Sequence, residues 1–213
     1  WSAAQTVTVS GIDDCRADGD ASYTIVIGAA ASADPAYDGM DAADVEAVNT
    51  DDDVAGIAVT AAAGLSTSEA GGTASFEVVL TSCPAADVTV TLASSDEGEG
   101  TVSPASLTFT PADALAPQTV TVTGVDDCSV DGDAPYTIAV GPAASADAAY
   151  DGATGADVAV VNEDDDTAAL VVTPTSPPVT TEGGATATFL VALASCPSAD
   201  VTVGLTSSDT SEG

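Results

Sequence analysis

The sequence predicts an all-β protein made of tandem two-sheet β-sandwiches. Three observations predict it: the 213-residue chain repeats itself at long range, its apolar residues alternate with polar ones, and no segment shows a helical period. Alternation with a period of two places apolar side chains on one face of a strand, whereas a helix would bring them together every three to four residues.

The repeat has a period of 113 residues (128 − 15). Gln-Thr-Val-Thr-Val-Ser-Gly at 5–11 returns, with one Ser-to-Thr change, at 118–124. Asp-Asp-Cys at 13–15 likewise returns at 126–128. A period of this length corresponds to a domain rather than to one coil of a solenoid.

The period divides the chain into three parts. Residues 1–53 match the C-terminal half of a repeat, 54–166 form a complete repeat, and 167–213 match the N-terminal half of the next. A half repeat cannot bury a core of its own. We therefore expect the ends either to continue into a longer array, which is the interpretation we favour, or to complement each other between copies.

Within the complete repeat, Val and Thr alternate in short runs separated by Gly, Pro, Asp and Ser. Seven short strands in about one hundred residues, without helices, are typical of a two-sheet sandwich. We expect the alternating Thr residues to face solvent. The predicted strands lie near 55–61, 73–81, 87–93, 106–110, 118–125, 135–140 and 156–162.

The charge of the chain excludes several functions. It has 34 acidic residues, one basic residue (Arg16) and no His, for a formal net charge of −33. Nucleic acids and anionic membrane surfaces would repel it. The lack of His and Lys removes most acid–base and Schiff-base catalysis, so we predict that it is not an enzyme.

Disorder and membrane insertion are the alternatives to a folded, secreted chain. High net charge with only 4% aromatic residues is typical of disorder. A mean hydropathy of +0.28 and the regular alternation argue against it. The sequence has no run of 18 apolar residues, so we expect no membrane-spanning helix.

Strand counting brings acidic residues together. If the seven strands run alternately up and down, the first, third and fifth connections and the end of the last strand fall at one pole. Glu69, Asp96, the acidic stretch 126–131 and the triplet 164–166 occupy these positions. Oxygen-only ligands in loops suit calcium, which binds six to eight oxygens. The alternative is a solvated acidic surface, as in halophilic proteins.

At these positions the sequence resembles the Calx-beta family. The matching motifs are Glu-Ala-Gly-Gly at 69–72, Val-Asp-Asp-x-x-Val-Asp-Gly-Asp at 125–133 and the closing Asp triplet. The resemblance implies a seven-stranded immunoglobulin-like sandwich that binds calcium at one pole and occurs in tandem arrays of extracellular bacterial proteins. The cysteine inside the 125–133 loop and the long Ala-rich loop that follows the sixth predicted strand depart from the family pattern.

The resemblance also implies a set of calcium ligands, which the repeat extends to the flanking copies. The candidates in the complete repeat are Glu69, Asp96, Asp126, Asp127, Asp131, Asp164, Asp165 and Asp166. Those in the flanking copies are Asp13, Asp14, Asp18, Asp51, Asp52, Asp53, Glu182 and Asp209.

The four cysteines predict an oxidising, extracellular or cell-surface location. Strand counting places Cys83 at the pole opposite to Cys128, roughly 20–25 Å away. A disulfide needs Cα atoms within about 7 Å. We therefore predict that head-to-tail packing pairs Cys15 with Cys83 and Cys128 with Cys196, so that each bridge crosses a junction between repeats. Free buried cysteines are the alternative.

Together these features favour a structural protein: a rigid extracellular filament, stalk or adhesin shaft, stiffened by calcium and disulfides, whose partners are further copies of itself. The alternative is a ligand- or glycan-binding accessory module of a larger secreted protein, in contact with a cell surface or glycan. Tyr37 and Tyr150 precede Asp-Gly in equivalent loops. We expect them either to pack against the preceding repeat or to be plain turn residues.

Overall fold

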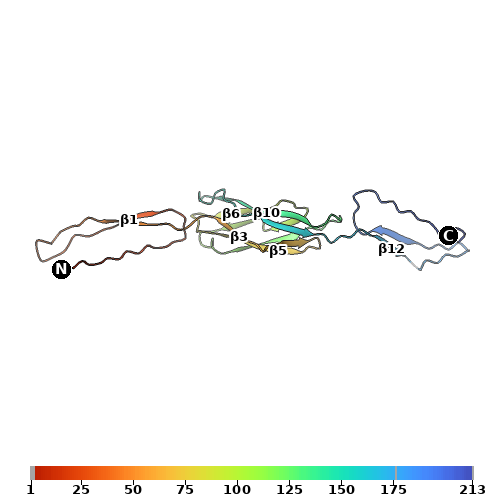
Figure 1. Cartoon of the computed structure of the whole chain (residues 1–213), viewed down its shortest axis with the longest axis horizontal. Coiled ribbons are helices and arrows are strands. Elements are labelled where there is room, and N and C mark those ends of the chain that lie inside the picture. Colours follow the sequence, from red (N-terminus) through yellow and green to blue (C-terminus); the bar gives the residue numbers. More distant parts are fainter. Residues whose placement is uncertain (1–2, 176, 213) are drawn as a thin grey trace.

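The computed structural model describes residues 3–175 and 177–212 and is all-β. Figure 1 shows an elongated molecule with one sandwich in the middle and an open segment at each end. We call residues 54–166 the central sandwich, 3–53 the N-terminal segment and 167–212 the C-terminal segment. The described residues contain no helix, and hence no apolar helix of membrane-spanning length.

The central sandwich consists of two antiparallel-rich sheets. One sheet has the order β4-β11-β10-β6-β8, and the other has the order β3-β5-β9-β7. Their strands are β3 (Ile57–Thr60), β4 (Leu65–Ser68), β5 (Thr73–Leu80), β6 (Val88–Ser94), β7 (Gly100–Ser103), β8 (Ser106–Phe109), β9 (Gln118–Gly124), β10 (Ala134–Ser145) and β11 (Val158–Glu163).

The fold class predicted from the sequence is confirmed, and all seven predicted strands are present. Two short strands, β4 and β7, were not predicted. After β3 the chain turns and crosses to the other sheet, where β4 pairs in parallel with β11. Strand β7 was assigned to a turn because it follows a Gly- and Asp-rich stretch. Strand β10 also continues past the predicted end at 140, because a register shift between Val140 and Ala143 lets it pair further along β6.

The core consists mainly of valines from alternating strand positions. In β9, Val120 and Val122 are fully buried, while Thr119, between Gln118 and Val120, is exposed. Val88 and Val90 of β6 face them from the opposite sheet and are also fully buried. Each such valine stabilises the fold by roughly 1.5–3 kcal/mol relative to an exposed one. The predicted solvent-facing role of Thr119 follows from the same alternation.

Each terminal segment is a hairpin with an extended strand-like stretch beside it. The N-terminal segment contains β1 (Ala21–Ile25) and β2 (Val45–Asn49), and the C-terminal segment contains β12 (Leu170–Pro174) and β13 (Phe189–Leu193). Figure 1 shows them extending from opposite ends of the central sandwich, with the two chain ends far apart. Neither segment has a second sheet within this chain to cover it, so their apolar residues are exposed.

Tyr150 packs inside its own sandwich, which differs from both roles expected from the sequence. Its side chain is 1% exposed, and its hydroxyl accepts a hydrogen bond from the Ser82 N–H (3.1 Å) and donates to the Ser82 carbonyl (2.8 Å). The equivalent Tyr37 is 60% exposed. The N-terminal segment has no counterpart of Ser82, so Tyr37 lacks this partner. Tyr150 therefore ties the β10–β11 loop to the residue before Cys83.

We expect Tyr150→Phe to lower the free energy of unfolding by about 1–3 kcal/mol, because it leaves buried polar groups of Ser82 without a partner. Urea denaturation followed by circular dichroism measures the change. Tyr37→Phe is the matched control, since it removes the same hydroxyl from an exposed position. Equal effects of the two substitutions would contradict the role assigned to Tyr150.

Candidate metal centre

The acidic pole of the central sandwich forms where β4 and β11 end side by side. These two strands are parallel, with Ser68 opposite Glu163, so the residues that follow them leave the sheet at the same edge. The Glu69 N–H donates to the Glu163 carbonyl (3.1 Å). Glu69 therefore lies next to the Asp triplet that follows β11.

The loop between β9 and β10, residues 125–133, is fastened to the same edge. The Asn162 side chain donates to the Val125 carbonyl (3.0 Å), and the Gly132 N–H donates to Asp164 Oδ2 (2.8 Å). The N-terminal segment repeats the first of these bonds, from Asn49 to the Ile12 carbonyl (2.8 Å). An Asn at the end of the strand thus brings the acidic loop to the acidic triplet in both copies.

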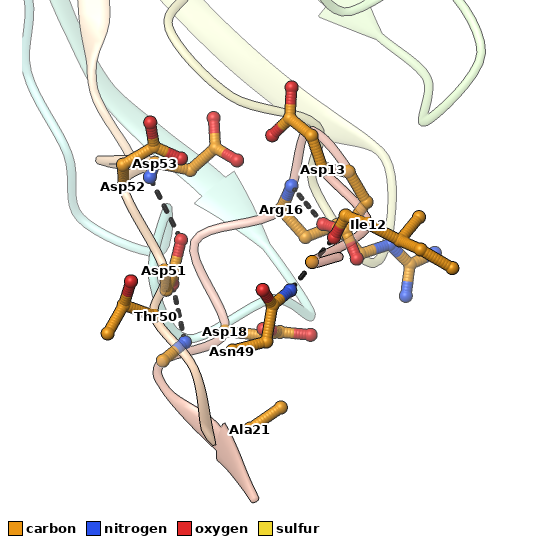
Figure 2. Close-up of a pocket in the computed structure, with 13 residues that line it drawn as sticks. Ile12, Asp13, Arg16, Asp18, Ala21, Asn49, Thr50, Asp51, Asp52 and Asp53 are labelled. Atoms are coloured by element: carbon orange, nitrogen blue, oxygen red, sulfur yellow. Dashed lines mark hydrogen bonds between the residues drawn. The ribbon is translucent and has the colours of Figure 1, made fainter. Parts of the chain in front are cut away.

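Three groups of carboxylates result, and in each the three residues offer oxygens within 4.8 Å of one another. Glu69, Asp164 and Asp166 form the first group, and Glu99, Asp127 and Asp131 form the second. Both lie at the acidic pole of the central sandwich. The third group, in the N-terminal segment, is Asp13, Asp52 and Asp53. Figure 2 shows Asp52 and Asp53 near Asp13, beside the Asn49 bond to Ile12.

The other candidates predicted from the sequence lie outside these three groups. Several accept hydrogen bonds from nearby backbone N–H groups: Asp96 from Gly98, Asp14 from Arg16, Asp51 from Gly19 and Asp53, and Asp209 from Ser211. Asp126 and Asp165 lie beside Asp166, close enough to raise its pKa. Asp18 lines the acidic pocket of the N-terminal segment, and Glu182 is exposed in a turn.

Glu99 is the functional candidate that sequence reasoning missed. The 94–100 stretch was taken as one turn, with Asp96 as its ligand. In the structure Gly100 already begins β7, and the Val125 N–H donates to the Glu99 carbonyl (3.1 Å). This bond brings Glu99 to the 125–133 loop. The repeat carried a signal for it, because Glu212 stands at the equivalent position (99 + 113).

The charges of this pole oppose one another. Burial raises the pKa of Glu69, against a hydrogen bond from the Asp165 N–H that lowers it, and the charges of Asp164, Asp127 and Asp166 raise it further. Burial, followed by neighbouring carboxylates, also raises the pKa of Asp166. Hydrogen bonds from the N–H groups of Asp166 and Gly132 lower the pKa of Asp164. A cation bound here would remove the repulsion that Glu69 and Asp166 experience.

The donor set fits a hard cation. Asp166 Oδ2 is buried and has no hydrogen-bond partner among the described residues, and Glu69 is 4% exposed. All donors of the groups are carboxylate oxygens, which suit calcium. Zinc prefers His or thiolate, but the chain has no His and all four cysteines are in disulfides.

Two disulfides cross the junctions between the central sandwich and the terminal segments. They join Cys15 to Cys83 and Cys128 to Cys196, with Cα–Cα distances of 5.1 and 5.0 Å. These are the pairs expected from strand counting. The Cys196 N–H also donates to the Cys128 carbonyl, and Ser129 forms a parallel bridge with Cys196. The bridge next to Asp127 thus fastens the acidic pole to the segment that follows.

Arg16 lies at the N-terminal junction. It lines a small pocket with Asp18, Ser82, Cys83 and Asp147. The N–H groups of Ala85 and Ala149 hydrogen-bond the Asp147 carboxylate and lower its pKa, and the charge of Arg16 contributes in the same direction. The single basic residue of the chain therefore lies beside a carboxylate of the neighbouring sandwich.

No protein-family model and no curated protein matches the chain. Among solved structures, the apo form of the Calx CBD1 domain is 18% identical, with a TM-score of 0.38, over 52% of this chain and 98% of that one. CBD12 from CALX1.2 is 16% identical, with a TM-score of 0.38, over 62% and 68%. Domains 4 and 5 of the S-layer protein SbsC are 20% identical, with a TM-score of 0.33, over 57% and 58%. Calx-beta domains are thus among the solved structures to which this fold is similar, as the sequence motifs predict.

We expect Glu69→Gln to stabilise the protein in chelator at pH 7, because it removes a carboxylate whose charge the folded state disfavours. The folded pKa of Glu69 is raised, so its contribution to stability is fully present below the unfolded pKa and is lost as the pH rises through the folded pKa. The gain from Glu69→Gln should therefore shrink as the pH falls toward about 4, near the unfolded pKa.

Urea denaturation of both proteins between pH 4 and 8 measures this gain. Glu77→Gln, which removes an exposed carboxylate on β5, is the control and should show no such trend. A gain from Glu69→Gln that grows as the pH falls would contradict the analysis.

Proposed function

We propose that the chain is part of a rigid extracellular rod, such as a filament, stalk or adhesin shaft, built from tandem β-sandwiches with calcium at their junctions. One observation carries the proposal: both disulfides cross from one structural unit to the next, and both lie in the loop that carries the acidic residues. A bridge within one sandwich would stabilise that sandwich alone, whereas a bridge between units fixes their relative position.

The connections at each junction support stiffness. Strand β2 ends at Asn49 and β3 begins at Ile57, and β11 ends at Glu163 while β12 begins at Leu170. The linkers are therefore short, and neither is rich in the Gly and Ser residues of flexible linkers. Together with the disulfide, each junction has two covalent connections. Two connections at separate points restrict bending far more than one does.

Calcium would act at the same place. The carboxylates of the acidic pole lie beside Cys128, so an ion bound by Glu69, Asp164 and Asp166 would order the loops that form the junction. The buried, unpartnered Asp166 Oδ2 supports this assignment. In this proposal the chain provides length and rigidity, and it has no catalytic role.

The alternative of a glycan-binding module has less support. The aromatic residues of the central sandwich are Phe76, Phe109, Tyr136 and Tyr150, and all four are buried. Within residues 54–166, which the structure describes in full, no aromatic ring is therefore exposed for a sugar to stack on. A structural role fits this surface better.

We expect calcium to raise the thermal unfolding midpoint of the protein relative to chelator, because an ion that binds only the folded state stabilises it. A calcium concentration 100-fold above the dissociation constant would add about 2.7 kcal/mol. Asp166→Asn should lose most of this increase. Asp87→Asn, which removes an exposed carboxylate outside the three groups, should keep it. Equal midpoints in calcium and chelator would overturn the calcium assignment.

We expect the junction to become flexible when both restraints are removed. Replacing Cys128 and Cys196 with Ser and adding chelator should broaden the angle between the central sandwich and the C-terminal segment. Small-angle X-ray scattering and negative-stain electron microscopy measure this as a shorter average length and a wider spread of angles. Straight particles of unchanged length under these conditions would contradict the stiffening role.

A further inference from the structure

The terminal segments expose residues whose equivalents form the core of the central sandwich. In the N-terminal segment, Val7 and Val9 are 80% and 48% exposed, whereas the equivalent Val120 and Val122 are fully buried. Repeat sequences that are nearly identical here differ in burial because a second sheet is present in one case and absent in the other. The N-terminal segment therefore has a core face without a cover.

The C-terminal segment shows the same difference on the other half of the sandwich. Phe189 is 48% exposed and its equivalent Phe76 is 2% exposed. Val201 is 51% exposed, whereas its equivalent Val88 is fully buried. Both terminal segments thus present an apolar face whose contacts are known from the central sandwich.

The two faces are complementary. The N-terminal segment is equivalent to the part that carries β9, β10 and β11, and the C-terminal segment to the part that carries β3, β4, β5 and β6. In the central sandwich these parts are joined by three strand pairs, β5–β9, β6–β10 and β4–β11. Only residues 101–113, which include β8 and most of β7, have no equivalent in either segment. Both are edge strands, so every inner strand pair can form without them.

We propose that the C-terminal segment of one copy docks onto the N-terminal segment of a second copy, and that the two form a sandwich with the strand register of the central one. The surface and its partner are different parts of the same chain, so the contact is head-to-tail and leaves a free segment at each end of the pair. Such a contact extends into a filament rather than closing into a dimer.

Docking would also complete carboxylate groups that one chain leaves unfinished. Glu182 is equivalent to Glu69, and it would join Asp51 and Asp53, the equivalents of Asp164 and Asp166. In the same way Glu212, the equivalent of Glu99, would join Asp14 and Asp18. Both glutamates come from one copy and the aspartates from the other. The effect of calcium on docking rests on the proposed function, whereas docking itself rests on the apolar faces and the strand register.

A pair of introduced cysteines tests the register. Ser75 and Thr121 are opposite each other in β5 and β9, and their equivalents are Thr188 and Thr8. The variant with Thr8→Cys and Thr188→Cys should form disulfide-linked dimers and higher multimers under mild oxidation. The matched control has Thr8→Cys and Thr206→Cys. Thr206 is equivalent to Ala93 on β6 of the opposite sheet, so the control should give few crosslinks.

Size-exclusion chromatography with light scattering tests docking without new cysteines. The mass of the unmodified chain should rise with concentration, and a variant with Val7→Asp and Val9→Asp should remain monomeric. Its circular dichroism should still show the folded central sandwich. A monomeric unmodified chain at all concentrations, or equal crosslinking of the two cysteine pairs, would overturn the proposal.

Repeating both measurements in chelator separates docking from calcium binding. Weaker docking in chelator, with the same crosslinked pair, is the expected result. Docking that is unchanged in chelator would remove calcium from this contact and leave the strand register standing. Docking lost in the Asp variant but unaffected by Glu182→Gln would lead to the same conclusion.

Discussion

A β-sheet with one apolar face needs a second sheet to cover it, and this constraint governs the whole chain. Where both halves of a repeat are present, Val120 and Val122 meet Val88 and Val90 and water is excluded. Where only one half is present, the same alternation leaves Val7 and Val201 in solvent. The alternation that folds the central sandwich thus also defines the contact surfaces of the ends.

Covering the core fixes the position of the acidic loops. Once β4 lies parallel to β11, Glu69 and the Asp triplet leave the sheet at one edge. The fold then brings together charges that repel each other, and the raised pKa values of Glu69 and Asp166 reflect this. A structure that holds such groups so close, with Asp166 Oδ2 buried and unpartnered, is organised for a cation.

Much of this arrangement could be predicted from the sequence. Period-two alternation identifies strands, and an exact repeat of 113 residues identifies the unit and the cysteine pairs. What could not be predicted depends on paths between strands. The crossing that creates β4, and the start of β7 that selects Glu99 rather than Asp96, follow from tertiary hydrogen bonds. Tyr150 was missed for a similar reason: its partner Ser82 is 68 residues away.

Arg16 makes the two joints of one chain chemically different. At the N-terminal joint its guanidinium lies near Asp147, whereas the equivalent position at the other joint is Ser129. One joint therefore carries a permanent positive charge from the protein, and the other depends on dissolved ions alone for compensation. A change in salinity would act unevenly along such a molecule, softening the joint that follows the central sandwich before the joint that precedes it.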